Sequence, residues 1–105
     1  MLLDAQIDAR DGLARVGKAL ADPTRCSLLV CLLEGDHYPA DLADHLGLTR
    51  ANVSNHLACL RGCGLVVATQ EGRRARYRLA DDRLAHALQD LADLALALPD
   101  ACEVQ

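Results

Sequence analysis

The fold is decided by residues 40–60, which read ADLADHLGLTRANVSNHLACL. Two sets of apolar residues recur there at helical spacing, namely Leu42, Ala43 and Leu46, then Val53, Leu57 and Leu60. Gly47 follows the first set, which is typical of a helix closed by a left-handed glycine. Thr49 is a favoured N-cap for the second helix. Two short helices joined by a tight glycine-containing turn predict a helix-turn-helix.

The segment after this motif predicts a β-hairpin. Residues 65–69 are rich in Leu and Val, residues 70–73 have turn composition, and residues 74–79 alternate in polarity. The alternation places Ala75, Tyr77 and Leu79 on one face of the second strand and Arg74, Arg76 and Arg78 on the other. A solvated strand face has a similar pattern, but three arginines without opposing acids favour contact with nucleic-acid phosphates.

Three further helices surround these elements. Residues 4–21 have an imperfect helical period, and residues 81–98 have a strong one. The third of these helices begins at Asp22 and Pro23, because an Asp side chain accepts hydrogen bonds from free backbone N–H groups and Pro suits the first helical position. Gly35 ends that helix. The sequence therefore predicts a mainly α fold with a small β-hairpin, which is a winged helix-turn-helix.

The last helix is too apolar for a monomer. Apolar residues recur at heptad-like spacing on one side and continue on the other flank: Leu84, Leu88, Leu91, Ala95 and Leu98, then Leu94 and Leu96. We therefore expect a homodimer held by the terminal helices, with Leu88 and Leu91 at the interface. We expect residues 1–98 to form one DNA-binding and dimerisation domain and residues 99–105 to form a tail.

Charge is distributed unevenly along the chain. The net charge is −4, yet residues 47–80 hold six arginines and one acid, so that segment carries +5 and the remainder −9. A basic face on an acidic body is typical of a small DNA-binding domain. We therefore predict double-stranded DNA as a partner. No apolar run approaches the roughly 18 residues that span a bilayer, so we expect no membrane partner and a cytoplasmic location.

The second helix of the motif is expected to enter the major groove. Its polar residues near the N-terminus would then lie near base edges and phosphates. These residues are Thr49, Arg50, Asn52, Ser54, Asn55 and His56. Arg can pair bidentately with guanine and Asn with adenine, whereas other members of the set cap the helix or contact phosphate.

The cysteines indicate a metal site. Their number is odd and their spacing is not that of a disulfide scaffold: Cys26, Cys31, Cys59, Cys63 and Cys102. Cys59 and Cys63 are four residues apart on one helix, so their Cβ atoms lie roughly 6 Å apart and both thiolates can bind one soft metal ion. Cys102 in the polar tail is the candidate third ligand. Burial as small apolar residues is the alternative, and we expect it for Cys26 and Cys31.

The proposed ligands continue the DNA-facing side of the helix. Asn52, His56, Cys59 and Cys63 follow one line at i, i+4, i+7 and i+11. Metal capture would therefore shift the reading residues themselves. His56 has two interpretations, as a DNA or capping residue and as a fourth ligand.

Three stretches resemble the ArsR/SmtB family of metal-sensing bacterial repressors. They are Ala21-Asp22-Pro23-Thr24-Arg25, residues 48–57, and Leu60-Arg61 followed by Gly64-Leu65-Val66. Residues 59–69, which read CLRGCGLVVAT, are similar to the cadmium- and lead-sensing members.

This resemblance implies a homodimer that represses its operon in the apo form and releases DNA when metal binds. It implies Cd(II) or Pb(II) as the sensed ion, with Zn(II) as a further candidate. It also implies that Cys59 and Cys63 bind the ion together with Cys102 of the other protomer. The family's arsenic-sensing cysteines are missing from residues 37–44, and its zinc-sensing set is missing from the last helix, where His86 is expected at the surface or the dimer interface.

Three alternatives remain at this stage. A thiol-based redox-sensing repressor would use the same cysteines but respond to peroxide without metal. A metal-storage protein would not need the arginine row or the helix-turn-helix. An enzyme is not indicated, because no Ser/His/Asp or Cys/His set lies in a recognisable catalytic context.

Overall fold

The computed structural model describes residues 2–99. Within them, five helices and two strands follow one another as α1 (Leu2–Ala21), α2 (Pro23–Leu33), α3 (Pro39–Leu46), α4 (Arg50–Gly62), β1 (Val66–Glu71), β2 (Arg74–Leu79) and α5 (Asp82–Ala97). The predicted mainly α fold with one hairpin is confirmed, and each element begins and ends within two residues of its expected bounds. None of these helices is long and apolar enough to cross a membrane.

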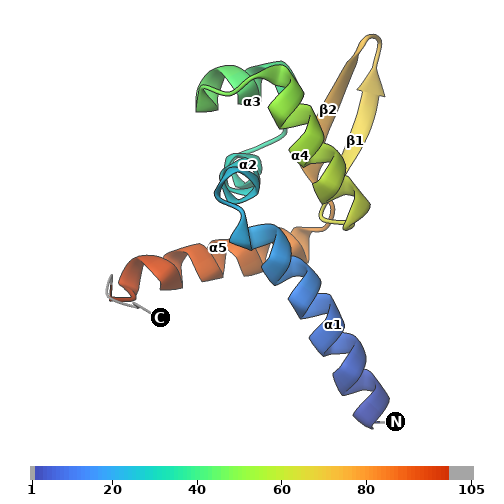
Figure 1. Cartoon of the computed structure of the whole chain (residues 1–105), viewed down its shortest axis with the longest axis vertical. Coiled ribbons are helices and arrows are strands. Elements are labelled where there is room, and N and C mark those ends of the chain that lie inside the picture. The colour runs from blue at the N-terminus through green and yellow to red at the C-terminus, as the bar shows by residue number, and fades with distance from the viewer. Residues whose placement is uncertain (1, 100–105) are drawn as a thin grey trace.

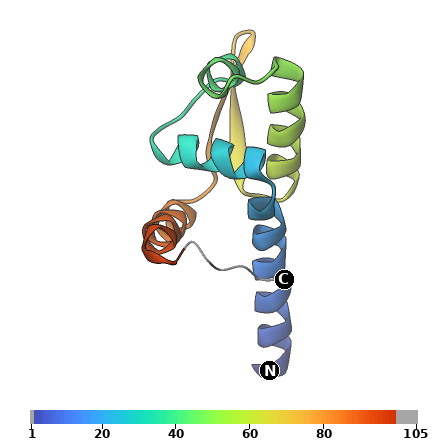
Figure 2. The ribbon, with the colours of Figure 1, turned by 60° about the vertical axis from the view of Figure 1, so that its left-hand side comes forward.

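The elements form two ends around a central helix. Figures 1 and 2 show α2 in the middle, with α3, the start of α4 and the tip of the hairpin at one end. In both views α1 and α5 lie at the other end, and α1 extends away from the rest of the molecule. The charged and the apolar candidate surfaces therefore lie at opposite ends of the protomer.

The junction between α1 and α2 is held by capping groups. The Asp22 carboxylate accepts a hydrogen bond from the Arg25 backbone N–H at 3.0 Å, as expected for an N-cap. The Arg25 guanidinium reaches back to α1 and donates to the carbonyl oxygens of Ala19 at 3.2 Å and Lys18 at 3.0 Å. One arginine thus satisfies free carbonyls at the end of α1 while its own backbone starts α2.

The turn between α3 and α4 depends on Gly47. This residue has φ 68°, the left-handed conformation, and Leu48 N–H donates to the Ala43 carbonyl at 2.9 Å across the turn. Thr49 then caps α4 by accepting a hydrogen bond from Asn52 N–H at 3.0 Å. Both features agree with the prediction from residues 40–60, because caps and left-handed glycines are local signals.

Substitution of Gly47 by Ala should lower the free energy of unfolding by about 1 to 2 kcal/mol, because an L side chain is strained at this φ. No atom lies within 4 Å of an added Cβ, so a steric clash would not contribute. Gly47→Asn is the matched variant, since Asn tolerates the left-handed region, and it should recover part of the loss. Thermal unfolding of the two variants and the parent measures the difference; equal stability for Ala and Asn would contradict this account.

The hairpin is longer than the sequence suggested. Gln70 and Glu71, expected in a four-residue turn, instead pair with Ala75 and Arg74, and β1 continues to Glu71. Gly72 has φ 62°, which lets the chain reverse over Gly72 and Arg73 alone. The prediction of the turn was therefore wrong in length, because one glycine suffices where a longer polar loop was assumed.

The core lies between α2, α3, α4 and the hairpin. Its most deeply buried side chains are Leu28, Leu29, Leu42, Val53, Leu57, Leu60 and Val66. The three inward residues predicted for α4 are all among them. Arg50 to Arg61 are thereby held on a rigid helix whose remaining face points outward.

Leu88 corrects the interpretation of α5. It was expected at a dimer interface, but it is only 7% exposed within the protomer and belongs to this core. Leu91, Leu94 and Leu98 remain about half exposed, and Leu96 is 88% exposed. The heptad-like pattern therefore combines one position that packs inside the protomer with neighbours that are left uncovered.

Candidate functional site

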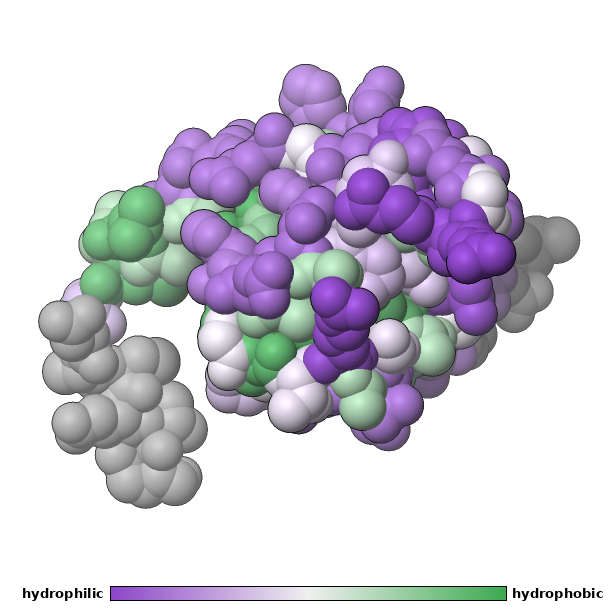
Figure 3. Space-filling model, turned by 90° about the horizontal axis from the view of Figure 1, so that it is seen from above, coloured by the Kyte–Doolittle hydropathy of each residue, from purple (hydrophilic) through white to green (hydrophobic). Residues whose placement is uncertain are grey.

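The outer face of α4 carries the polar residues expected to read DNA. Thr49, Arg50, Asn52, Ser54 and Asn55 are exposed and His56 is half-buried. The Thr49 hydroxyl oxygen already accepts the capping bond from Asn52 N–H, which gives this residue a structural role. Figure 3 looks onto the end that carries α3, the start of α4 and the hairpin tip, and this face is mostly hydrophilic.

Cys59 and Cys63 lie one helical turn apart at the far end of α4. Cys63 N–H donates to the Cys59 carbonyl at 3.0 Å, so the helical geometry continues through the C-cap residue Cys63. Cys59 is exposed, whereas Cys63 is half-buried and packs against the core. The pair offers an accessible thiol and a more fixed thiol on the same side of one helix, as their spacing predicted.

A third metal ligand is not supplied by the part of the chain that the structure describes. Within residues 2–99 no group of three or more His, Cys, Asp or Glu side chains could hold a metal ion. Cys102 lies outside the described residues, as does most of the predicted tail. The two thiols suit a soft metal ion, and completing the site requires a donor from elsewhere in the chain or from a second copy.

The arginine row on β2 corrects the expectation that no acids oppose it. Its three members do alternate with inward side chains, but Arg76 is held by two carboxylates. Its Nε donates to Glu71 at 2.8 Å and another guanidinium nitrogen donates to Asp36 at 2.5 Å. Asp36 lies 40 residues earlier in the sequence, so the hairpin pattern alone could not reveal this pair.

Tyr38 joins the same network. Its hydroxyl donates to the second oxygen of Glu71 at 2.6 Å, and the Arg74 guanidinium carbon lies 3.5 Å from the centre of its ring. Arg74 also lies 3.7 Å from an Asp41 carboxylate oxygen. The Tyr38 hydroxyl, and then Arg76, lower the pKa of the Glu71 carboxyl, because both stabilise its ionised form.

Backbone hydrogen bonds join the α2–α3 loop to the hairpin as well. His37 N–H donates to the Tyr77 carbonyl at 3.0 Å, and Tyr77 N–H donates to the His37 carbonyl at 2.8 Å. The hairpin is thus tied to the body of the protein by two main-chain bonds and by the Asp36, Arg76, Glu71 and Tyr38 side chains. Arg78, in contrast, has no ion pair within residues 2–99.

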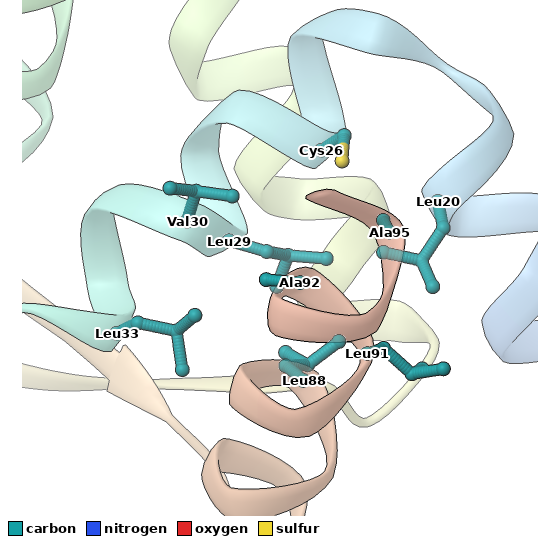
Figure 4. Close-up of a pocket in the computed structure, with 9 residues that line it drawn as sticks. All are labelled: Leu20, Cys26, Leu29, Val30, Leu33, Leu88, Leu91, Ala92 and Ala95. Carbon is teal, nitrogen blue, oxygen red and sulfur yellow. The ribbon is translucent and has the colours of Figure 1, made fainter. Parts of the chain in front are cut away.

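The remaining cysteines lie away from α4's outer face. Cys31 is buried, and its burial, together with the nearby Glu34 carboxylate, raises the pKa of its thiol. Cys26 is half-buried and lines an apolar cavity of about 200 Å³ between α1, α2 and α5. Figure 4 shows its sulfur at the α2 side of this cavity, with Leu88, Leu91, Ala92 and Ala95 on α5. The core role expected for these cysteines holds fully for Cys31 and partly for Cys26.

Comparison with known proteins identifies the family. Residues 22–67 match the family described as bacterial regulatory protein, arsR family. The HTH-type transcriptional regulator CmtR of Mycobacterium tuberculosis is 69% identical over 86 residues, which cover 82% of this chain and 73% of that protein. The chain belongs to the ArsR family. It is therefore a transcriptional regulator with a winged helix-turn-helix, a class of DNA-binding protein and not an enzyme.

Solved structures of ArsR-family proteins agree with this fold. The NMR structure of the cadmium metal-sensor CmtR from M. tuberculosis has a TM-score of 0.70 and 63% identity, covering 89% of this chain and 96% of that chain. The homodimeric winged helix-turn-helix DNA-binding domain of Mb0332 from Mycobacterium bovis, a possible ArsR-family regulator, has a TM-score of 0.81 and 34% identity, covering 88% of this chain and 85% of that chain.

Two residues beside the arginines of β2 were not named as candidates by the sequence analysis. Arg73 lies in the two-residue hairpin turn and is exposed, and Tyr38 precedes α3 and supports Arg74. A basic residue beside a turn glycine was a usable signal for Arg73. Tyr38 is one of only two aromatic residues in the chain, and its rarity was the only sequence signal for a special role.

Proposed function

We propose that this ArsR-family chain is a metal-responsive repressor. As a homodimer it binds operator DNA in the apo form, in the cytoplasm, and dissociates when a soft ion such as Cd(II) or Pb(II) binds. The metal ligands are Cys59, Cys63 and Cys102. The DNA-binding residues are those of α4 and the hairpin named above: Thr49, Arg50, Asn52, Ser54, Asn55, His56, Arg74, Arg76 and Arg78.

The observation that carries this proposal is the position of the thiol pair on the recognition helix. Cys59 lies seven residues after Asn52, which is about 10 Å along the helix axis at 1.5 Å per residue. Val53, Leu57 and Leu60 pack the inward side of α4 against the core along its length. A force on its last turn therefore shifts the whole helix as one rigid body and does not bend it locally. A third ligand from another segment would apply that force when the ion is captured.

The tail and its origin are part of the proposal. The tail, residues 99–105, brings Cys102 to the thiol pair, either within one protomer or from the second. The named cadmium sensor among the relatives supports cadmium as the first ion to test. Zn(II) is a weaker candidate, because it is borderline-soft and is bound well by many other donor sets.

Metal titration of the purified protein bound to its operator tests the function. Cd(II) should weaken DNA binding by about 5-fold to 150-fold, the usual range of allosteric coupling. Sulfur-to-metal charge-transfer absorption should appear in the near ultraviolet at the same stoichiometry. Release by peroxide in the presence of a chelator, with no response to Cd(II), Pb(II) or Zn(II), would instead support the redox-sensing alternative.

A further inference from the structure

A positively charged groove lies between the recognition helix and the hairpin. It is lined by Tyr38 at the start of α3, by Arg50 and Ser54 on α4, and by Arg73, Arg74 and Tyr77 on the hairpin. These residues come from consecutive parts of the chain, the start of α3, the start of α4 and the hairpin, and span positions 38 to 77. Figure 3 looks onto the end of the protomer that carries these elements.

The charge in the groove is little compensated. Arg50 and Arg73 are exposed and form no ion pair within residues 2–99. Arg74 is paired with Asp41 at a long 3.7 Å, in an exposed position where such a pair contributes little. The other two acids nearby, Asp36 and Glu71, are both bound to Arg76. Three arginines therefore line a groove that has no carboxylate among its lining residues.

The start of α3 adds to the same potential. Its N-cap, Tyr38, gives no side-chain hydrogen bond to the helix, so the N–H groups of the first turn are left without a side-chain partner. Pro39 and Ala40 of that first turn line the groove. The positive end of the helix dipole thus acts together with the arginines.

Arg74 is held in place by Tyr38. The guanidinium stacks on the ring, and the ring itself is fixed by the hydroxyl bond to Glu71. Ordering of a long side chain before binding reduces the entropy lost when a ligand is bound. Arg76 supplies the other bond that fixes Glu71, so it acts on the groove through Glu71 and Tyr38.

We propose that this groove seats a backbone phosphate of double-stranded DNA. Arg73 and Arg50 are its principal contacts, and Arg74 is prealigned on Tyr38. Arg76, one of the DNA-binding residues named above, contributes here as a positioning residue that braces the hairpin through Glu71 and Asp36. This assignment rests on the proposed function. It adds Arg73 and Tyr38 to the DNA-binding surface and gives Arg76 a role different from that of its neighbours on β2.

The salt dependence of DNA binding tests the groove. Arg73→Gln should weaken apo binding to operator and random DNA alike, by about tenfold per protomer at 0.1 M salt, and lower the slope of log affinity against log salt by about 0.9 per protomer. Arg50→Gln should lower the slope similarly. Arg61→Gln, an exposed arginine on the last turn of α4 and outside the groove, is the matched control for loss of one charge and should change the slope by much less.

Two further variants separate contact from positioning. Arg76→Gln should weaken binding and lower the temperature of unfolding while leaving the salt slope unchanged, because its guanidinium meets carboxylates only. Tyr38→Phe keeps the ring under Arg74 but removes its bond to Glu71, so it should lose part of the affinity, whereas Tyr38→Leu also removes the stacked ring and should lose more.

The outcomes distinguish failure of the groove assignment from failure of the proposed function. If the parent binds DNA but Arg73→Gln behaves like Arg61→Gln in affinity and slope, with an unchanged circular dichroism spectrum, the groove assignment is overturned and the repressor proposal stands. If the parent binds no DNA under any metal condition, both are overturned.

Discussion

Replacing Cys59 by Ser should leave DNA binding by the apo protein within about twofold of the parent and remove most of the cadmium-induced release. The exposed position of Cys59 means that the substitution changes no core packing. A serine hydroxyl is a hard oxygen donor that does not substitute for a thiolate toward Cd(II) or Pb(II). Loss of this one sulfur ligand should therefore remove most of the coupling free energy between metal binding and DNA binding, about 1 to 3 kcal/mol.

Cys63→Ser and Cys102→Ser should lose the response too. Cys63 is half-buried against the core, so its serine variant also places a hydroxyl in a partly apolar environment and should lower the melting temperature slightly. The response to metal, normalised to apo binding, separates this structural effect from loss of a ligand. Because thiolates must form before metal binds, metal affinity of the parent should fall as pH drops.

The other two cysteines provide the controls. Cys26→Ala and Cys31→Ala should respond to Cd(II) like the parent, since both thiols lie on α2, away from the outer face of α4. A normal response from Cys102→Ser would remove the tail ligand from the proposal. A normal response from Cys59→Ser and Cys63→Ser as well would remove the metal site on α4 altogether.

The helix-turn-helix was predictable because its signals are local. Gly47 and Thr49 act within a few residues of their own positions, and the buried stripe of α4 follows from helical periodicity alone. The thiol pair belongs to the same class of inference, since two residues four apart on a helix share a side whatever the rest of the chain does. Cys102 was predicted as a ligand from its residue type alone, because helical and strand periodicity do not predict which part of the protein a tail contacts.

The hairpin and its arginines were predictable only in part. Strand alternation placed Arg76 on the outer face, but its partner Asp36 comes from the loop between α2 and α3. Such pairing depends on tertiary contacts that a strand pattern does not contain. The groove around Arg73 has the same origin, because its walls belong to α3, α4 and the hairpin, and no single segment indicates it.

Leu88 shows a different limit. A heptad-like row of apolar residues says that one side of α5 is buried, but it does not say whether the same chain or a second copy covers each position. Leu88 packs into the protomer's own core, beside Leu29 and the apolar cavity of Figure 4. Substitution of Leu88 would therefore unfold the protomer instead of separating two copies.

The proposed dimer should dissociate when Leu91 and Leu94 are both replaced by Asp. These side chains are 51% and 56% exposed in the protomer, so the change leaves its core intact. Burial of a leucine contributes about 1.5 to 3 kcal/mol, and a symmetric interface loses two residues on each of two protomers. The dissociation constant should then rise by about four orders of magnitude or more, each 1.4 kcal/mol being tenfold.

Sedimentation velocity at micromolar concentration should show this variant as a monomer with the circular dichroism spectrum of the parent. Gln89→Asp places the same acid on an exposed polar position of α5 and should stay dimeric. DNA binding should fall with dimerisation, because two recognition helices on one face read half-sites one helical turn apart, and a monomer holds only one of them. A doubly substituted protein that remains dimeric and binds DNA normally would place the interface elsewhere. The exposed leucines of α5 would then need a different partner, since an apolar surface this continuous is rarely left in water.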